Sequence, residues 1–152
     1  MSEIHRIEVG IATKGGLRNA ILQDLDISSV QKVEMIDVYT IEGGQLTADE
    51  LEFLGREVFS DPIVEHFAVD QPLASPFDGA IVEVGFKPGV TDPVGITILQ
   101  AVNDALNKSI AGAYNSRQYL LYGTDQATAE RITRDLLANG LIERWQVQDG
   151  NN

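Results

Sequence analysis

The amino-acid sequence predicts an α+β protein built from two β-α-β-α-β repeats related by a pseudo-two-fold axis, with antiparallel or mixed sheets and helices packed on one face. Two observations predict this fold class. Hydrophobic periodicity along the chain alternates between the short period of strands and the longer period of helices. The second half also repeats the first, because residues 7–10 (Ile-Glu-Val-Gly) match residues 82–85 (Val-Glu-Val-Gly) at an offset of 82 − 7 = 75 residues. Repetition of this kind indicates a duplicated structural unit.

The first half contains the elements of one repeat. Three segments rich in β-branched and aromatic residues are predicted as strands, at residues 6–11, 33–41 and 63–69. Between the first two strands, residues 17–25 are predicted as a short helix. A second helix begins after Thr47, which forms a capping-box pattern with Glu50. The apolar stripe of this second helix contains Leu51, Leu54, Val58 and Phe59.

The second half keeps the same order and register of signals. The N-cap Thr47 corresponds to Asp125 at an offset of 125 − 47 = 78 residues, and the helix stripe that follows is apolar in both halves. In the second half that stripe contains Ala129, Ile132, Leu136 and Leu137. The sequence therefore predicts a first repeat at residues 1–70 with a degenerate first loop, a linker at 71–79 and a second repeat at 80–152. Two such units in one chain would bury each other's open edges and apolar faces, as the subunits of a homodimer do.

The longest helix signal lies in the second half, after the strand predicted at residues 81–85. Asp92 is predicted as the N-cap and Pro93 as the first helical residue, where its missing N–H costs nothing. The predicted buried face of this helix contains Val94, Ile98, Ala101, Val102, Ala105 and Leu106. The first half has no equivalent of the segment Lys-Pro-Gly-Val-Thr-Asp-Pro-Val-Gly at residues 87–95, so the two copies differ most at this loop.

Composition makes several classes of function unfavourable. Among 152 residues, Asp and Glu outnumber Lys and Arg by 23 to 11, which gives a formal net charge of −12. Such a surface repels phosphate backbones and anionic lipids, so neither a nucleic acid nor a membrane is expected as a partner. The sequence has no cysteine, which excludes disulfides and thiolate metal sites. Without a signal-peptide pattern or a membrane-spanning apolar run, a cytoplasmic protein is expected.

The sequence shows no set of residues with a catalytic spacing. The two histidines, His5 and His66, have no second histidine or cysteine at a metal-ligand spacing. Neither a phosphate-binding glycine loop nor a serine nucleophile motif is present. Neighbouring acids such as Asp49 and Glu50 lie at predicted helix starts, where they stabilise the helix dipole. The sequence therefore predicts no catalytic, cofactor-binding or metal-binding residue in this chain.

The candidate functional residues are instead partner contacts. The loop before the long helix carries Lys87, and the free N–H groups at the helix start offer a site for an anion or a carboxylate. The alternative is a structural turn that needs Gly89 for its conformation and Pro93 to start the helix. Arg117 and Tyr119 on the following strand are further candidates, although tyrosines on strands are ordinarily half-buried. The full candidate set is Lys87, Gly89, Asp92, Gly95, Arg117 and Tyr119.

Two motifs in the second half carry a family resemblance. Residues 87–95 are quoted above, and residues 135–143 read Asp-Leu-Leu-Ala-Asn-Gly-Leu-Ile-Glu. In this order and spacing they resemble the PurS family, the small non-catalytic subunit of phosphoribosylformylglycinamidine synthase in purine synthesis. Two fused copies are similar to the N-terminal region of the long, single-chain form of the synthetase. The first half departs from the family pattern because it lacks the Asp-Pro-x-Gly turn.

The resemblance implies an assembly role. Proteins of this family bridge a synthetase (PurL-type) and a glutaminase (PurQ-type) in the conversion of FGAR, glutamine and ATP to FGAM. ATP and magnesium are then expected on the partner synthetase, with no cofactor in this chain. A small-molecule-sensing regulatory α+β module is a second interpretation, since duplicated units often bind ligands at their interface. A small enzyme is a third interpretation, and the absence of a set of catalytic residues argues against it. The length and ending allow either a whole subunit or the start of a longer synthetase.

Overall fold

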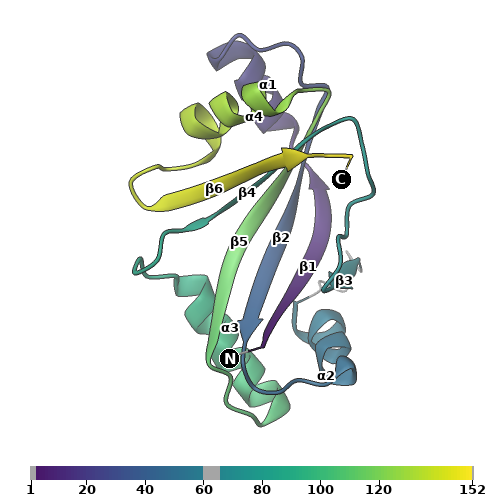
Figure 1. Ribbon diagram of the computed structural model, residues 1–152, viewed down its shortest axis with the longest axis vertical. Coiled ribbons are helices and arrows are strands. Elements are labelled where there is room, and N and C mark those ends of the chain that lie inside the picture. The colour runs from purple at the N-terminus through teal and green to yellow at the C-terminus, as the bar shows by residue number, and fades with distance from the viewer. Residues whose placement is uncertain (1–2, 60–65, 152) are drawn as a thin grey trace. The chain divides into compact units, whose positions relative to one another are not determined.

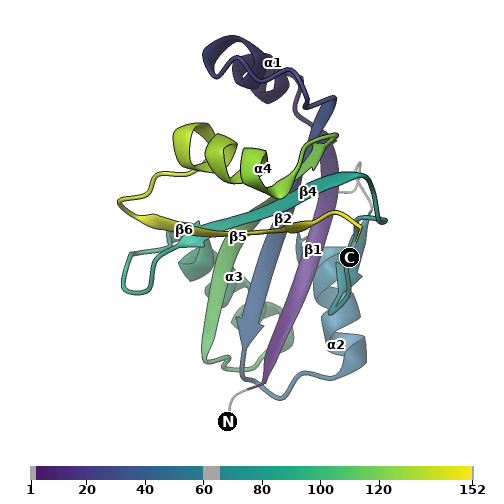
Figure 2. The ribbon, with the colours of Figure 1, turned by 45° about the horizontal axis from the view of Figure 1, so that its top comes forward.

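The computed structural model describes residues 3–59 and 66–151, in which strands and helices alternate (Figure 1; Figure 2). The elements of the first half are β1 (Ile4–Thr13), α1 (Gly15–Asp24), β2 (Lys32–Glu42), α2 (Ala48–Phe53), the π-helical segment η1 (Leu54–Phe59) and β3 (Phe67–Val69). Those of the second half are β4 (Gly79–Phe86), α3 (Pro93–Leu106), β5 (Gly112–Tyr122), α4 (Gln126–Ile132), the π-helical segment η2 (Thr133–Leu137) and β6 (Glu143–Asp149). Both halves follow the predicted order strand, helix, strand, helix, strand.

The six strands form one sheet in the order β3-β1-β2-β5-β4-β6. The outer pairs are antiparallel: Ile7 of β1 lies opposite Val69 of β3, and Val84 of β4 lies opposite Trp145 of β6. Figure 1 shows the neighbouring strands β1 and β2 running in opposite directions. These features confirm the predicted α+β class. The strands of each half occupy neighbouring positions in the sheet, as a duplication predicts, and the pseudo-two-fold relation itself stays a prediction.

The chain packs as two compact units, neither of which is continuous in sequence. Unit 1 contains Met1–Gly10, Asp37–Ala74 and Thr91–Ser116, and unit 2 contains Ile11–Ile36, Ser75–Val90 and Arg117–Asn152. Strands β1, β2 and β5 therefore contribute residues to both units. The units describe packing, whereas the predicted repeats and linker describe similarity along the sequence. The repeat boundaries at residues 70 and 80 stay a prediction.

The core of unit 1 is covered by the amphipathic helix α2 and its continuation η1. The predicted capping box is present: Glu50 N donates to Thr47 Oγ1 at 3.1 Å, and Thr47 N donates to Glu50 Oε1 at 2.9 Å. Leu51 and Leu54 of the predicted stripe are buried with residues of β1, β2 and β5. The first part of the third strand, predicted at residues 63–69, falls at residues 63–65, outside the described residues.

Helix α3 begins where the sequence predicts but buries a different face. Asp92 is the N-cap, as predicted, with its Oδ1 accepting a hydrogen bond from Gly95 N at 2.8 Å. The prediction that Val94 and Ala105 face the core is wrong, because both side chains are exposed. Gly95 is buried instead, and a Cβ there would lie 2.5 Å from the backbone oxygen of Ala113. The close approach of the helix to β5 therefore determines which face of α3 is buried. The fully buried residues of α3 are Gly95, Ile98 and Val102.

The core of unit 2 is built around α4 and its continuation η2. Asp125 is the N-cap, as predicted, and its Oδ1 accepts a hydrogen bond from Thr128 N at 2.7 Å. Trp145 on β6 packs against this core, and its Nε1 donates to Glu130 Oε1 at 2.9 Å. The buried residues of the predicted stripe are Ala129, Ile132 and Leu137. Periodicity predicts helix at these positions in both halves but does not distinguish the π-helical ends.

The contact between α3 and β5 gives a first prediction. Gly95→Ala should destabilise the protein by about 2 kcal/mol, because the added methyl group would overlap the Ala113 oxygen and the Asp92 carboxyl, which lies 2.9 Å away. Gly16→Ala in α1 is the matched control, since no atom lies within 4 Å of its Cβ position, and this change should stabilise the helix by about 0.5 kcal/mol. Denaturant unfolding measures both. Equal stability of Gly95→Ala and the wild type would contradict the close approach.

Candidate functional site

The six predicted contact residues lie in different surroundings. Lys87 and Gly89 are exposed, Asp92 and Arg117 are half-buried, and Gly95 and Tyr119 are buried. Asp92 and Gly95 belong to unit 1, whereas the other four belong to unit 2. A partner can reach Lys87 and Gly89 without rearrangement of the chain. The partner-contact role of all six residues stays a prediction.

The loop after β4 holds Lys87 on a defined turn. Lys87 N donates to Ile142 O at 2.8 Å, which joins this loop to the turn before β6, and Val90 N donates to Lys87 O at 3.1 Å. Gly89 has a φ of +87°, the left-handed conformation in which side chains are strained, with no atom within 4 Å of its Cβ position. The backbone therefore requires glycine here, while the space around it stays open.

Asp92 uses both of its carboxylate oxygens within unit 1. In addition to capping α3, it accepts a hydrogen bond at Oδ2 from Asn115 N on β5 at 2.8 Å. Asn115 Nδ2 in turn donates to Val38 O on β2 at 3.3 Å. Asp92 thus fixes the start of the helix to the sheet, a role beyond the cap that its sequence position indicates. The N–H of Gly95 in the first turn of α3 is paired with this carboxylate of the same chain.

Arg117 pairs with Glu143 in unit 2. Arg117 Nη1 lies 2.7 Å from Glu143 Oε2, and Nη2 donates to Oε1 at 3.2 Å, a bidentate geometry. Two further donors are also used, because Nε donates to the Tyr119 hydroxyl at 2.6 Å and Nη2 to Leu137 O at 2.9 Å. Glu143, which is only 7% exposed, also accepts from Asn139 N at 2.8 Å. Tyr119 therefore supports Arg117 from the core, and Arg117 compensates a buried carboxylate.

The charges of this pair reinforce each other. Burial by itself would raise the pKa of Glu143, but the hydrogen bonds from Arg117 and from the Asn139 backbone outweigh it and lower that pKa below its ordinary 4.5. Burial likewise opposes the charged form of Arg117, and the contacts with Glu143 and Tyr119 nevertheless raise its pKa. Both groups are therefore ionised at neutral pH. The pair positions the chain around it.

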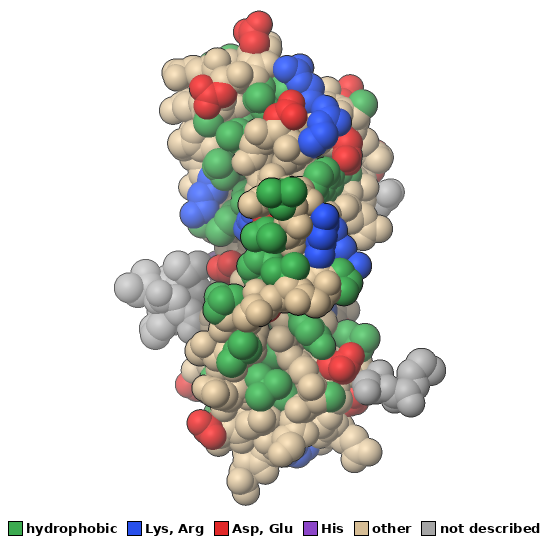
Figure 3. Space-filling view, turned by 90° about the vertical axis from the view of Figure 1, so that its left-hand side faces the viewer, with side chains coloured by type: hydrophobic (Ala, Val, Ile, Leu, Met, Phe, Trp, Pro, Cys, Tyr) green, Lys and Arg blue, Asp and Glu red, His purple; other side chains and the backbone are tan. Residues whose placement is uncertain are grey.

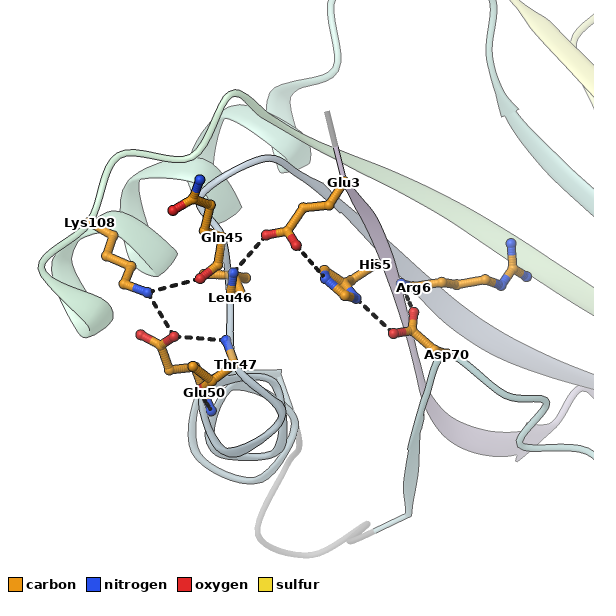
Figure 4. A network of polar contacts seen from close by, with 9 residues as sticks. All are labelled: Glu3, His5, Arg6, Gln45, Leu46, Thr47, Glu50, Asp70 and Lys108. Carbon is orange, nitrogen blue, oxygen red and sulfur yellow. Dashed lines mark hydrogen bonds and ion pairs between the residues drawn. The ribbon is translucent and has the colours of Figure 1, made fainter. Parts of the chain in front are cut away.

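A second polar network fixes the start of β1 in unit 1 (Figure 4). His5 Nδ1 lies 2.7 Å from Asp70 Oδ2, and Arg6 N donates to Asp70 Oδ1 at 2.8 Å. His5 Nε2 lies 3.3 Å from Glu3 Oε2 without hydrogen-bond geometry, so this contact is electrostatic. Burial alone would lower the pKa of His5, but the carboxylates of Asp70 and Glu3 outweigh it and raise the pKa above its ordinary 6.5.

The same view shows how distant segments of unit 1 are joined beside this histidine (Figure 4). Leu46 N donates to Glu3 Oε1 at 2.6 Å, which fixes the first described residue to the loop before α2. Lys108 Nζ lies 2.7 Å from Glu50 Oε1 and 3.3 Å from Gln45 O, which joins the end of α3 to the start of α2. These residues are engaged in stabilising contacts, and the sequence analysis identified only Glu50 among them, as a capping residue.

Unit 2 also contains a polar cavity of about 600 Å³. Asp78, Asp125 and Asp149 line it together with hydroxyl, amide and glycine residues. The other lining residues are Ser29, Gly79, Gly123, Thr124, Gln126, Thr128 and Asn151. No group of three or more His, Cys, Asp or Glu side chains with the geometry of a metal site occurs within residues 3–59 and 66–151. In the same ranges, no helix has the length and apolarity needed to cross a bilayer.

Comparison with known families identifies the second half of the chain. Residues 79–149 match the family model PurS, described as phosphoribosylformylglycinamidine (FGAM) synthase. We refer to residues 79–149 below as the PurS segment. The match confirms the resemblance noted in the sequence and links the chain to FGAM synthase of purine biosynthesis. Among curated proteins, none matches this chain significantly.

The PurS segment coincides with structural boundaries. It begins at the first residue of β4 and ends at the last residue of β6, and it contains all six candidate contact residues. It also contains Asn115, Asn139 and Glu143, which the sequence analysis did not select as functional. The motif at residues 135–143 that carries the resemblance includes Asn139 and Glu143. The resemblance to the family could therefore have indicated these two residues. The duplication of the segment in the first half stays a prediction.

The Arg117–Glu143 pair gives a second prediction. Arg117→Ala should cost about 2 kcal/mol at neutral pH, because it leaves the Glu143 carboxylate buried without its cation, although the half-buried arginine and the Asn139 contact moderate the loss. Arg134→Ala, which removes an exposed contact with Asp135 at 3.5 Å, is the control and should cost no more than about 0.5 kcal/mol.

The pH dependence separates charge compensation from lost packing in that experiment. Because the pKa of Glu143 is lowered in the folded wild type, the contribution of the pair is present at neutral pH and is lost as the pH falls through a folded value below 4.5. The difference in unfolding free energy between Arg117→Ala and the wild type should therefore become smaller at acidic pH. A difference that stays constant with pH would show that only packing was lost.

His5 gives a third prediction, with the opposite sign. Its folded pKa is raised, so its contribution is fully present below 6.5 and is lost as the pH rises through the higher folded value. His5→Gln should remove this decrease of the unfolding free energy with rising pH. The substitution should cost on the order of 0.5 kcal/mol of stability at mildly acidic pH. His66→Gln, which changes an exposed histidine, is the control and should leave the slope intact. Thermal unfolding as a function of pH is the measurement, and an unchanged slope in His5→Gln would contradict the assignment.

Proposed function

We propose that this chain is a non-catalytic adaptor of FGAM synthase that bridges a synthetase (PurL-type) and a glutaminase (PurQ-type), as separate subunits or as domains. The observation that carries the proposal is the PurS match over residues 79–149, which begins and ends with complete strands. The residues of this segment are used for caps, close packing and one buried ion pair. These contacts fix the backbone of the segment, as expected for a scaffold that presents a binding surface.

The exposed loop after β4 is the first part of the proposed contact surface. Lys87 is exposed, and its backbone is fixed by hydrogen bonds to Ile142 and Val90. A side chain on a fixed backbone loses less conformational freedom when it binds than one on a disordered loop. Arg117 and Tyr119 belong to the proposal as supports, because they hold Glu143 and the turn beside Lys87. Asp92 and Gly95 shape the start of α3 in the same segment.

The proposal assigns the chemistry to the partners. ATP and magnesium would bind to the synthetase, glutamine would be hydrolysed on the glutaminase, and this chain would hold the two in register in the cytoplasm. Ammonia released at one site must reach the other before it equilibrates with solvent. An adaptor that sets the relative position of the two sites would therefore affect the glutamine-dependent reaction and leave the ammonia-dependent reaction unchanged.

A second candidate function is a regulatory module that binds a small molecule. The polar cavity of about 600 Å³ in unit 2 favours it, since its size is that of an ordinary ligand site. Three aspartates in its lining would favour a ligand with amino or hydroxyl groups. Calorimetric titration with amino acids and nucleotides separates the two functions. Saturable binding that Asp78→Asn abolishes, without any association with the synthetase or glutaminase, would favour the regulatory module.

The adaptor function gives a fourth prediction. Adding the chain to a synthetase and a glutaminase should increase glutamine-dependent FGAM formation without changing the ammonia-dependent rate. Lys87→Ala should weaken association with a partner while the melting temperature stays within error, because an exposed lysine contributes little to stability. Arg18→Ala, an exposed cation of unit 2 outside the PurS segment, is the matched control. If the chain has no effect on either reaction and binds neither partner, the adaptor function is wrong.

A further inference from the structure

Leu141 is the most exposed large hydrophobic residue within the described part of the chain. It is 86% exposed, and the adjacent Ile142 is 40% exposed. Both lie in the turn between η2 and β6, inside the PurS segment. Figure 3 shows hydrophobic side chains gathered beside Lys and Arg side chains on the face that carries this turn. Contiguous exposed apolar side chains, unlike single ones, mark candidate contact surfaces.

The turn that carries these residues is held by four hydrogen bonds. Asn139 O accepts from Ile142 N at 3.1 Å and from Glu143 N at 2.7 Å. Asn139 Oδ1 accepts from Leu141 N at 3.0 Å, and Asn139 N donates to Glu143 Oε1 at 2.8 Å. Arg117 holds that same carboxylate in place. The exposed leucine is therefore presented on a pre-formed backbone, which lowers the entropy cost of binding.

Two cations flank the turn. Lys87 is joined to it through its backbone hydrogen bond to Ile142, and Arg144 follows Ile142 by two residues; both are exposed. Neither side chain forms an ion pair with any residue that the structure describes. The acid between them, Glu143, is buried and neutralised by Arg117. The exposed charge at this turn is thus positive, on a chain whose formal net charge is −12.

We infer that residues 139–142, with Lys87 and Arg144, form a docking knob that inserts into an apolar socket rimmed by carboxylates on a partner of the FGAM synthase assembly. The inference rests on the proposed adaptor function and specifies its contact. Leu141 enters the socket, Ile142 covers its edge, and the two cations pair with the acidic rim. Charge complementarity determines the chemistry of the socket, because the exposed apolar side chains of the turn are flanked by two cations that prefer a rim of carboxylates.

Three changes test this contact in the full chain. Leu141→Asp removes the central apolar group and places a like charge against the acidic rim, and it should weaken binding at least about tenfold. Leu141→Ala should weaken binding by a smaller factor. The double variant Lys87→Glu with Arg144→Glu should slow association and reverse the sign of its dependence on ionic strength, since rim charges act mainly on the association rate and like charges now face each other. Biolayer interferometry against the synthetase and the glutaminase, each immobilised separately, gives both rates.

Matched controls lie on α1 of the same unit. Leu22 is 40% exposed, and Leu22→Asp makes the same chemical change away from the turn. Arg18→Glu reverses an exposed charge there. Both variants should bind like the wild type. Far-ultraviolet circular dichroism and melting temperatures exclude unfolding as the cause of weaker binding, and Leu141 has too little buried surface for its replacement to affect folding.

The outcomes separate this inference from the adaptor function. If the wild type binds a partner and Leu141→Asp binds it equally well, the knob is wrong while the adaptor function stands. If the wild type binds neither partner, both the docking knob and the adaptor function are wrong. If Leu141→Asp instead dissociates a homo-oligomer in sedimentation and leaves partner binding intact, the turn contacts a second copy and the acidic socket is wrong. Weaker binding confined to the Leu141 and Lys87/Arg144 variants supports the knob.

Discussion

The organisation of the PurS segment in unit 2 depends on one buried carboxylate. Glu143 begins β6 opposite Phe86 at the end of β4, and a carboxylate so little exposed is stable only with compensation. Arg117 supplies the compensating charge from β5, and the backbone of Asn139 supplies a further donor. The start of β6, the turn before it and the middle of β5 are consequently fixed to one another. The Lys87 loop joins the same arrangement through its hydrogen bond to Ile142.

Packing and sequence divide the chain differently because three strands are long. Strands β1, β2 and β5 contain 10, 11 and 11 residues, enough for each to contribute residues to both units, and β2 and β5 contribute to both cores. Each core then receives helices and strands from both halves of the chain. The core of unit 1 combines α2 with α3, and that of unit 2 combines α1 with α4. Each core is therefore complete only when both halves of the chain are present.

Local signals in the sequence were sufficient for the element order and the helix starts, and insufficient for the contacts of the site. Thr47, Asp92 and Asp125 were predictable as caps because a cap is determined by residues within one helical turn. The buried face of α3 was not predictable, because Gly95 allows the helix to pack closely against β5 but has no hydrophobic side chain that a periodicity could reveal. The Arg117–Glu143 pair spans 26 positions and the His5–Asp70 contact spans 65, so no local pattern joins their members. The exposure of Leu141 is likewise a property of the fold, since the sequence shows only another leucine.

The two halves differ most in how their first helices are held. Helix α3 has 14 residues, an aspartate cap that also binds β5, and a proline in its first turn. Helix α1, at the same place in the element order, has 10 residues, no side-chain cap and only Ile21 fully buried. Close packing against the sheet therefore demands a specific loop in the second half and not in the first. The family match falls on the half with the specific loop, the buried ion pair and the pre-formed turn. The first half completes the two cores that hold this segment in place.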